Sequence, residues 1–77
     1  MPLPAPEERY ERLRALLVKA RKDAGLTQEE VAAKLRRPQS FVWKIENGVR
    51  RLDVVEFLEM AKAVGFDPHE LLRQLGR

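Results

Sequence analysis

Residues 26–48 read LTQEEVAAKLRRPQSFVWKIENG, and this stretch decides the fold. Thr27 lies directly before a helical repeat of apolar residues, and Glu30 follows it three positions later. A threonine and a glutamate at this spacing form a capping box, in which each side chain accepts a hydrogen bond from the other residue's backbone N–H. We therefore expect a helix over 28–35.

A second helical repeat follows after a very short connection. It begins at Pro38 and stops before Gly48, because glycine readily adopts the left-handed conformation that ends helices. Only Arg36 and Arg37 separate this segment, 38–46, from the first helix. Two short helices joined so closely have to cross steeply, as they do in a helix-turn-helix motif.

The capping pattern recurs towards the C-terminus. Two aspartates are each followed three residues later by a glutamate, and the pairs are Asp53 with Glu56 and Asp67 with Glu70. Apolar residues flank each pair, and a proline occupies the favoured first helical position after the second aspartate. We therefore expect three complete capping boxes in the chain, and further helices over 54–64 and 68–75.

The N-terminal segment has a different character. Prolines at positions 2, 4 and 6 prevent a helix from starting before residue 6, so residues 1–6 are expected to form an extended arm. Apolar residues then recur at helical spacing as far as Gly25, which predicts a helix over 7–24. No segment alternates with the period of a strand. The chain is therefore predicted to be an all-α, compact five-helix bundle, with residues 7–77 forming a single domain.

Composition narrows the classes of function. The 77 residues carry 15 lysines and arginines against 12 acidic residues, and the absence of cysteine excludes disulfides and thiolate metal sites. The basic excess is concentrated in residues 34–51, where six basic residues face one acid, whereas the remainder has a slight acidic excess. Such a segment favours an anionic partner. Without a long apolar stretch or a signal-peptide core, the protein is expected in the cytoplasm, with no membrane span.

The segment 38–46 has one apolar and one polar face when it is drawn as a helix. Val42 and Ile45 point inward together, with Phe41 and Glu46 on the flanks. The outward positions are polar apart from one tryptophan, and they are Gln39, Ser40, Trp43 and Lys44. Amide, hydroxyl and ammonium groups can hydrogen-bond base edges and phosphates. This face is therefore predicted to enter the major groove of double-stranded DNA.

Two runs of sequence resemble helix-turn-helix domains of the phage repressor and Cro type: GLTQEEVA at 25–32 and QSFVWKIENG at 39–48. The same class includes many bacterial regulators named after the xenobiotic response element. The resemblance covers residues 13–75 and implies five helices, of which the second and third form the helix-turn-helix. It also implies a DNA-binding regulator of transcription, with repression as the expected mode, that binds operators of two half-sites as a homodimer.

The resemblance assigns roles to individual positions. Gln28, at the start of the first motif helix, would bind a phosphate of the DNA backbone. The base-reading positions hold Gln39 and Ser40, with Lys44 one turn further along the same face. Phosphate contacts are also implied for three residues after this helix, namely Asn47, Arg50 and Arg51. Arg21 and Glu46 match two positions that form a structural ion pair between the first helix and the end of the third.

For each of these polar residues, the alternative is a solvent-exposed side chain that does not contact DNA. Arg36 and Arg37 in the turn are open to the same two interpretations, a DNA contact or solvent exposure. Trp43 departs from the family pattern, which has a small or polar residue at this position. Either its indole contacts sugars, phosphates or thymine methyl groups, or it folds over the aliphatic parts of Arg36, Gln39 or Asn47.

The remaining residues offer little for catalysis. His69 lies in a first helical turn with neither a second histidine nor a cysteine in the chain, so no metal or cofactor is expected. No serine, histidine and acid set and no phosphate-binding glycine loop can be assembled, which indicates that the protein is not an enzyme. The alternative function is an antitoxin-like or other protein-interaction module on the same scaffold.

A homodimer is expected because one small domain makes few contacts with DNA. Four apolar residues exceed what the expected core requires, namely Leu16, Val18, Leu71 and Leu75. They are the candidates for a contact between subunits, and burial within one subunit is the alternative.

Overall fold

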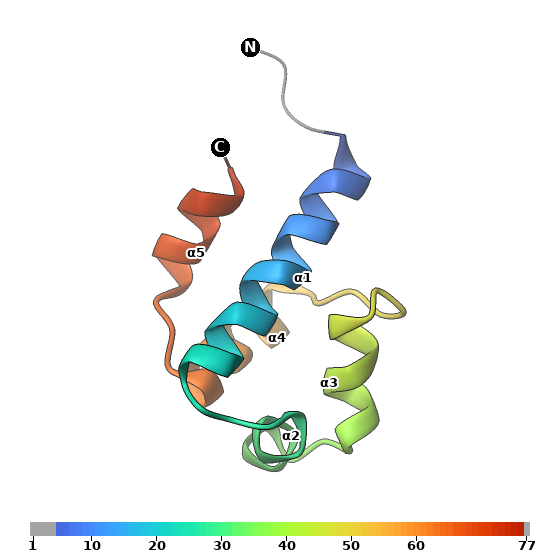
Figure 1. Ribbon diagram of the computed structural model, residues 1–77, viewed down its shortest axis with the longest axis vertical. Helices are drawn as coiled ribbons and strands as arrows, with labels where there is room; N and C mark the ends of the chain where they lie inside the picture. Colours follow the sequence, from blue (N-terminus) through green and yellow to red (C-terminus); the bar gives the residue numbers. More distant parts are fainter. Residues whose placement is uncertain (1–4, 77) are drawn as a thin grey trace.

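The computed structural model describes residues 5–76, which form five α-helices and no strand (Figure 1). The helices are α1 (Pro6–Asp23), α2 (Gln28–Leu35), α3 (Gln39–Glu46), α4 (Val54–Val64) and α5 (Pro68–Leu75). The predicted fold class is therefore confirmed, and each boundary lies within one residue of its prediction. Most of the arm predicted at residues 1–6 lies outside the described residues, and helix α1 already begins at Pro6.

Two capping boxes hold the starts of α2 and α4. Thr27 Oγ1 accepts a hydrogen bond from the Glu30 N–H at 3.1 Å, and Glu30 Oε1 accepts one from the Thr27 N–H at 2.9 Å. Asp53 and Glu56 make the same reciprocal pair of bonds, at 2.7 and 3.1 Å. Each cap typically contributes about 1 kcal/mol, which is a substantial share of the stability of a domain this small.

The prediction of a third capping box, formed by Asp67 and Glu70, is wrong for one of its two hydrogen bonds. Asp67 Oδ1 accepts hydrogen bonds from the backbone N–H groups of His69 and Glu70, so the cap itself is present. The Glu70 carboxylate does not complete the box, because it pairs with the Arg73 guanidinium one turn further along at 3.1 Å. Helix α5 therefore starts where the sequence predicts, but on a single cap.

One core joins all five helices. Its buried members are Leu17 of α1, Val31 and Ala32 of α2, Phe41, Val42 and Ile45 of α3, Phe57 and Met60 of α4, and Leu71 of α5. The apolar residues that precede the caps, Leu26, Leu52 and Phe66, pack against this core and fix the angle at which the chain enters each helix. Helix α1 contacts both α3 and α5, which lie on opposite sides of it in Figure 1.

The burial of Leu71 corrects one expectation. Leu71 is only 6% exposed and belongs to the core, so it is not available for a contact between subunits. The reason is the register of α5, which turns Leu71 inward and leaves Leu72 on the solvent side. Leu16 also packs against the core, whereas Val18 and Leu75 are partly exposed.

Candidate nucleic-acid interface

A tight turn joins α2 to α3. Arg36 ends α2 with φ 57° and ψ 43°, the left-handed conformation that glycine usually supplies at this position. The Arg36 N–H donates to Ala33 O at 3.1 Å, and the Arg37 N–H donates to Ala32 O at 3.0 Å. Pro38 has extended backbone and serves as the N-cap of α3, so the helix begins one residue later than predicted. This connection holds α2 and α3 in mutual contact.

Helix α3 divides into a buried and an exposed side. Val42 and Ile45 are buried as predicted, and Phe41 joins them rather than lying on the flank. The exposed side carries the residues predicted to face outward, which are Gln39, Ser40, Trp43 and Lys44. With three apolar anchors in the core, the helix presents this polar side in a fixed orientation.

The indole of Trp43 is 48% exposed. Asn47, one turn further along, donates from Nδ2 to the Trp43 backbone carbonyl at 2.9 Å and so caps the end of α3. About half of the indole is thus open to solvent, and Trp43 lies one turn beyond Gln39 on the exposed side of α3.

An ion pair and an amide lock α3 to α1 and α2. Arg21 Nε donates to Glu46 Oε2 at 2.7 Å and Arg21 Nη2 donates to Glu46 Oε1 at 3.0 Å. Gln28 Nε2 donates to the same Glu46 Oε1 at 2.9 Å, and Arg21 Nη1 donates to Leu26 O. The hydrogen bond to Glu46 raises the pKa of the Arg21 guanidinium. The start of α2 and the last turn of α3 are thus held at a fixed separation.

The loop after α3 is ordered by a second cluster, centred on Glu56 of α4. Arg50 donates from Nη1 to Glu56 Oε1 at 2.9 Å and from Nη2 to Oε2 at 2.7 Å, and Nη1 also donates to Arg51 O. The Arg37 guanidinium lies 3.7 Å from Glu56 Oε2, and both guanidinium groups lie over the Phe41 ring, 4.5 and 4.7 Å from its centre. Loop and turn are therefore tied to the same carboxylate.

The Glu56 carboxylate has an unusually low pKa. The hydrogen bonds from Arg50, followed by the bond from the Asp53 N–H, lower its pKa to about 2. The same contact raises the pKa of the Arg50 guanidinium. The sequence assigned Glu56 to the capping box alone, because nothing in the local pattern indicates that Arg50, six residues earlier, reaches the same carboxylate.

Comparisons with known proteins agree with this geometry. A family model described as a helix-turn-helix domain matches residues 12–75. A solved XRE-family like protein from Pseudomonas syringae pv. tomato str. DC3000 is 54% identical and has a TM-score of 0.86, and the match covers 90% of this chain and 84% of that chain. The chain belongs to the helix-turn-helix DNA-binding domains of the Cro/C1 (XRE) type.

Two further relatives are consistent with this helix-turn-helix family. An uncharacterized HTH-type transcriptional regulator, y4dJ, from Sinorhizobium fredii is 38% identical over 52 residues, which is 68% of each protein. The restriction-modification controller protein C.AhdI from Aeromonas hydrophila is 31% identical with a TM-score of 0.73, covering 80% of this chain and 94% of that chain. The family is thus one of transcriptional regulators.

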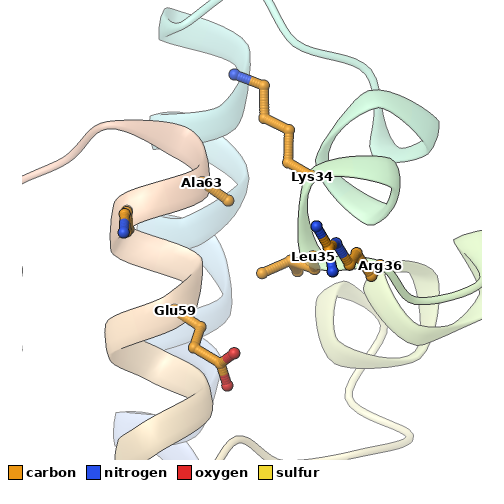
Figure 2. A pocket seen from close by; sticks show the side chains of 6 residues that line it. Lys34, Leu35, Arg36, Glu59 and Ala63 are labelled. Carbon is orange, nitrogen blue, oxygen red and sulfur yellow. The ribbon is translucent and has the colours of Figure 1, made fainter.

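The basic residues of the helix-turn-helix domain lie on more than one side of it. A groove of about 500 Å³ separates the end of α2 from α4, and Figure 2 shows Lys34, Leu35 and Arg36 facing it from α2. Glu59, Lys62 and Ala63 of α4 complete its lining. Lys34 and Arg36 therefore border α4, and the positive charge near the exposed side of α3 comes from Lys44 and from the loop that follows.

The part of the chain that the structure describes contains neither a metal-binding cluster nor a membrane-spanning helix. Among residues 5–76 no group of three histidine or acidic side chains could hold a metal ion. Within the same residues no helix is long and apolar enough to cross a membrane. The exposed side of α3 and its flanking loop remain the candidate site of this helix-turn-helix domain.

Proposed function

We propose that this helix-turn-helix domain regulates transcription by reading the major groove of double-stranded DNA with α3. The observation that carries the proposal is the exposed side of α3, where Gln39, Ser40 and Lys44 offer hydrogen-bonding groups to solvent. An α-helix fits the major groove, whose base edges present a distinct set of donors and acceptors for each base pair. A polar helix face held rigidly by a buried apolar face is suited to that task.

Base recognition is assigned to the first turn of α3. The Gln39 amide can both donate and accept, which matches the N6 and N7 groups of adenine, and the Ser40 hydroxyl suits several bases. Lys44 lies one turn further along the same side and can reach either a guanine acceptor or a phosphate. The partly exposed Trp43 lies beside them and supplies an apolar surface for sugars or thymine methyl groups.

Phosphate contacts are assigned to residues at the two ends of the motif. Gln28 uses one Nε2 hydrogen on Glu46 and keeps the other for a phosphate near the start of α2, where the helix dipole also favours an anion. Asn47 has a comparable free hydrogen, because only one of its hydrogens is engaged by Trp43 O. Arg51 is exposed after the end of α3, where its guanidinium can donate to a phosphate.

Arg50 contributes mainly by ordering the loop. Three of the five N–H donors of an arginine are already engaged by Glu56 and the Arg51 carbonyl. The phosphate contact predicted for Arg50 stays a prediction, and it would have to use the two remaining donors. Its contact with the Phe41 ring and its hydrogen bond to the Arg51 carbonyl hold the loop after α3 in place.

A homodimer is part of the proposal, because two copies double the contacts on an operator of two half-sites. Its contact surface is assigned to α4, where Val54, Val55 and Leu58 are 74%, 66% and 50% exposed. Val54 and Leu58 are four residues apart and Val55 and Leu58 three, so all three lie on one face of the helix. Val18 and Leu75 are secondary candidates.

Repression is the proposed mode of regulation, and the cytoplasmic nucleoid is the proposed location. A dimer bound across a promoter excludes other proteins from the same DNA, which needs no contact beyond those to the duplex. Regulation of this kind is consistent with the transcriptional regulators among its relatives.

Selection from a library of random duplexes tests the proposed function. The purified protein is mixed with the library, bound duplexes are recovered and sequenced, and the enriched site is placed in a promoter that drives a reporter gene. We expect one enriched site with two related half-sites and lower reporter output when the protein is present. Failure to enrich any sequence, together with a stable complex with another protein, would favour the protein-interaction alternative.

A further inference from the structure

Helix α1 approaches the loop after α3 at Gly48. Gly48 has φ +75°, and a Cβ atom built on it would lie 3.0 Å from Arg14 Cζ and 3.2 Å from Arg14 Nε. The Arg14 guanidinium therefore lies against the Gly48 backbone, where a side chain would press on it and the left-handed backbone favours glycine. This contact brings a cation from the middle of α1 to the end of α3, beside Asn47.

The same guanidinium borders a small hollow of about 70 Å³ between α1 and the loop. The polar side chains around the hollow are Tyr10, Arg14, Arg50 and Arg51, and no aspartate or glutamate lines it. Three guanidinium groups at one hollow repel one another unless anions compensate them. The excess of positive charge at this place is therefore a feature that requires an explanation.

The three arginines are compensated to different degrees. Arg50 is paired with Glu56, and Arg51 lies over the Tyr10 ring with its Cζ 3.8 Å from the ring centre. Among residues 5–76, no carboxylate lies within 4 Å of Arg14. Glu11 and Glu46 line another hollow together with Arg14, but neither forms an ion pair with it, and the Glu46 carboxylate is already engaged by Arg21 and Gln28.

We propose that Arg14 on α1 is a further phosphate-contacting residue, and that together with Arg51 it grips the DNA backbone beside the groove that α3 occupies. The proposal rests on the proposed DNA binding. Its geometry rests on the contact with Gly48, which places the Arg14 guanidinium at the end of α3, where backbone contacts would set register and orientation. A guanidinium forms two parallel hydrogen bonds to a phosphate, so both arginines are suited to such a contact.

A purely structural role makes different predictions. A cation near the C-terminal end of α3 also interacts favourably with the helix dipole. In that case the loss of Arg14 would lower stability and leave the salt dependence of DNA binding unchanged. A phosphate contact instead releases counterions from the DNA. Its loss therefore makes the plot of the logarithm of the binding constant against the logarithm of salt concentration less steep.

The test uses the full chain, the duplex selected from the random library, and a scrambled duplex of the same length. Fluorescence anisotropy of the labelled duplexes gives Kd between about 50 and 200 mM salt. Arg14→Gln should lower the logarithmic salt slope by about 0.9 per subunit and weaken binding roughly eightfold per subunit near 0.1 M salt, equally for both duplexes. Arg51→Gln should behave in the same way, and Arg14→Lys should keep the slope.

Arg73→Gln is the matched control, because it removes the same charge at an exposed position of α5, and this helix lies on the other side of α1 from α3 (Figure 1). It should bind both duplexes like the original protein. An Arg14→Gln protein that is folded, as judged by circular dichroism, and keeps the original slope would overturn the Arg14 proposal alone. If the unaltered protein binds no duplex, both the proposed function and this proposal fail.

Discussion

The Arg21 guanidinium and the Glu46 carboxylate form a two-point ion pair, with Nε–Oε2 at 2.7 Å and Nη2–Oε1 at 3.0 Å. The side chains are only 13% and 8% exposed, so water screens the pair weakly. Because Arg21 belongs to α1 and Glu46 to the last turn of α3, the pair sets how α3 is oriented on the rest of the domain. Gln28 adds the start of α2 to the same carboxylate.

Glu46→Ala should therefore destabilise the domain by roughly 2 kcal/mol, because it leaves the Arg21 charge mostly buried without its partner. For a domain of this size the loss corresponds to a decrease in Tm of about 10 °C. Thermal unfolding followed by circular dichroism measures it. Lys19→Ala is the control, since Lys19 forms an exposed ion pair with Asp23 whose loss should cost below about 0.5 kcal/mol. Equal effects of the two substitutions would contradict the structural importance of the buried pair.

Acid should unfold the domain partly through Glu56. Its folded-state pKa of about 2 lies below the ordinary value of 4.5, so the Arg50 and Asp53 contacts stabilise the fold above pH 4.5. That stabilisation is lost as the pH falls from about 4.5 towards 2, because the unfolded state then binds the proton more tightly. The Glu30 pKa is lowered by its bonds to Thr27 and acts in the same direction.

Urea unfolding between pH 7 and pH 2 checks this expectation. Glu56→Gln should lower stability at pH 7 and flatten its decline in acid, whereas the exposed Glu59→Gln on the same helix should change neither. If Glu56→Gln kept the full acid-dependent decline, the stabilising role of the carboxylate cluster would be wrong.

Base reading by α3 predicts a loss of preference for one sequence. Gln39→Ala and Ser40→Ala should each reduce the ratio of affinities for the selected and scrambled duplexes about fivefold to a hundredfold, since a good base contact discriminates by about 1–3 kcal/mol. Arg51→Gln is the comparison, because it should weaken both duplexes alike and leave the ratio unchanged. An unchanged ratio in both α3 variants would remove Gln39 and Ser40 from the base-reading site.

The two interpretations of Trp43 predict different outcomes for Trp43→Ser. If the indole contacts DNA, affinity should fall while Tm stays nearly constant, because the indole is already 48% exposed in the free protein. If it packs over neighbouring residues, Tm should fall instead. We expect the first result, and because Trp43 is the single tryptophan of the chain, its emission should also change when DNA is added.

Leu58→Glu tests the contact assigned to α4. A carboxylate on this exposed apolar face should weaken dimerisation measured by analytical ultracentrifugation, while the helix content of the monomer stays the same. Leu71→Ala provides the contrast, because a core cavity should cost about 2–5 kcal/mol of folding stability irrespective of association. A Leu58→Glu protein that dimerises like the original would show that the subunit contact does not involve this face of α4.

The sequence predicted most of this fold because its helix ends are encoded locally. Thr27 with Glu30 and Asp53 with Glu56 lie three residues apart, so their hydrogen bonds follow from spacing alone. The left-handed turn at Arg36 had no such signal, since glycine rather than arginine normally marks it.

Within the candidate site, local pattern predicted exposure and missed tertiary contacts. The helical repeat indicated that Gln39, Ser40 and Lys44 point outward, which depends only on α3. The placement of Arg50 on Glu56 and of Arg14 against Gly48 depends on how separate elements pack. Spacing along the chain could not have revealed either contact.

Whether α3 reads double-stranded DNA is tested most directly by titrating the selected and scrambled duplexes with the unaltered protein at increasing salt. We predict tighter binding of the selected duplex at every salt concentration, and a logarithmic slope of about −0.9 for each phosphate that a lysine or arginine neutralises. For a dimer in which Arg14, Lys44 and Arg51 of both subunits engage phosphates, the slope should be near −5. Equal affinity for the two duplexes, or binding that does not change with salt, would contradict DNA reading by α3.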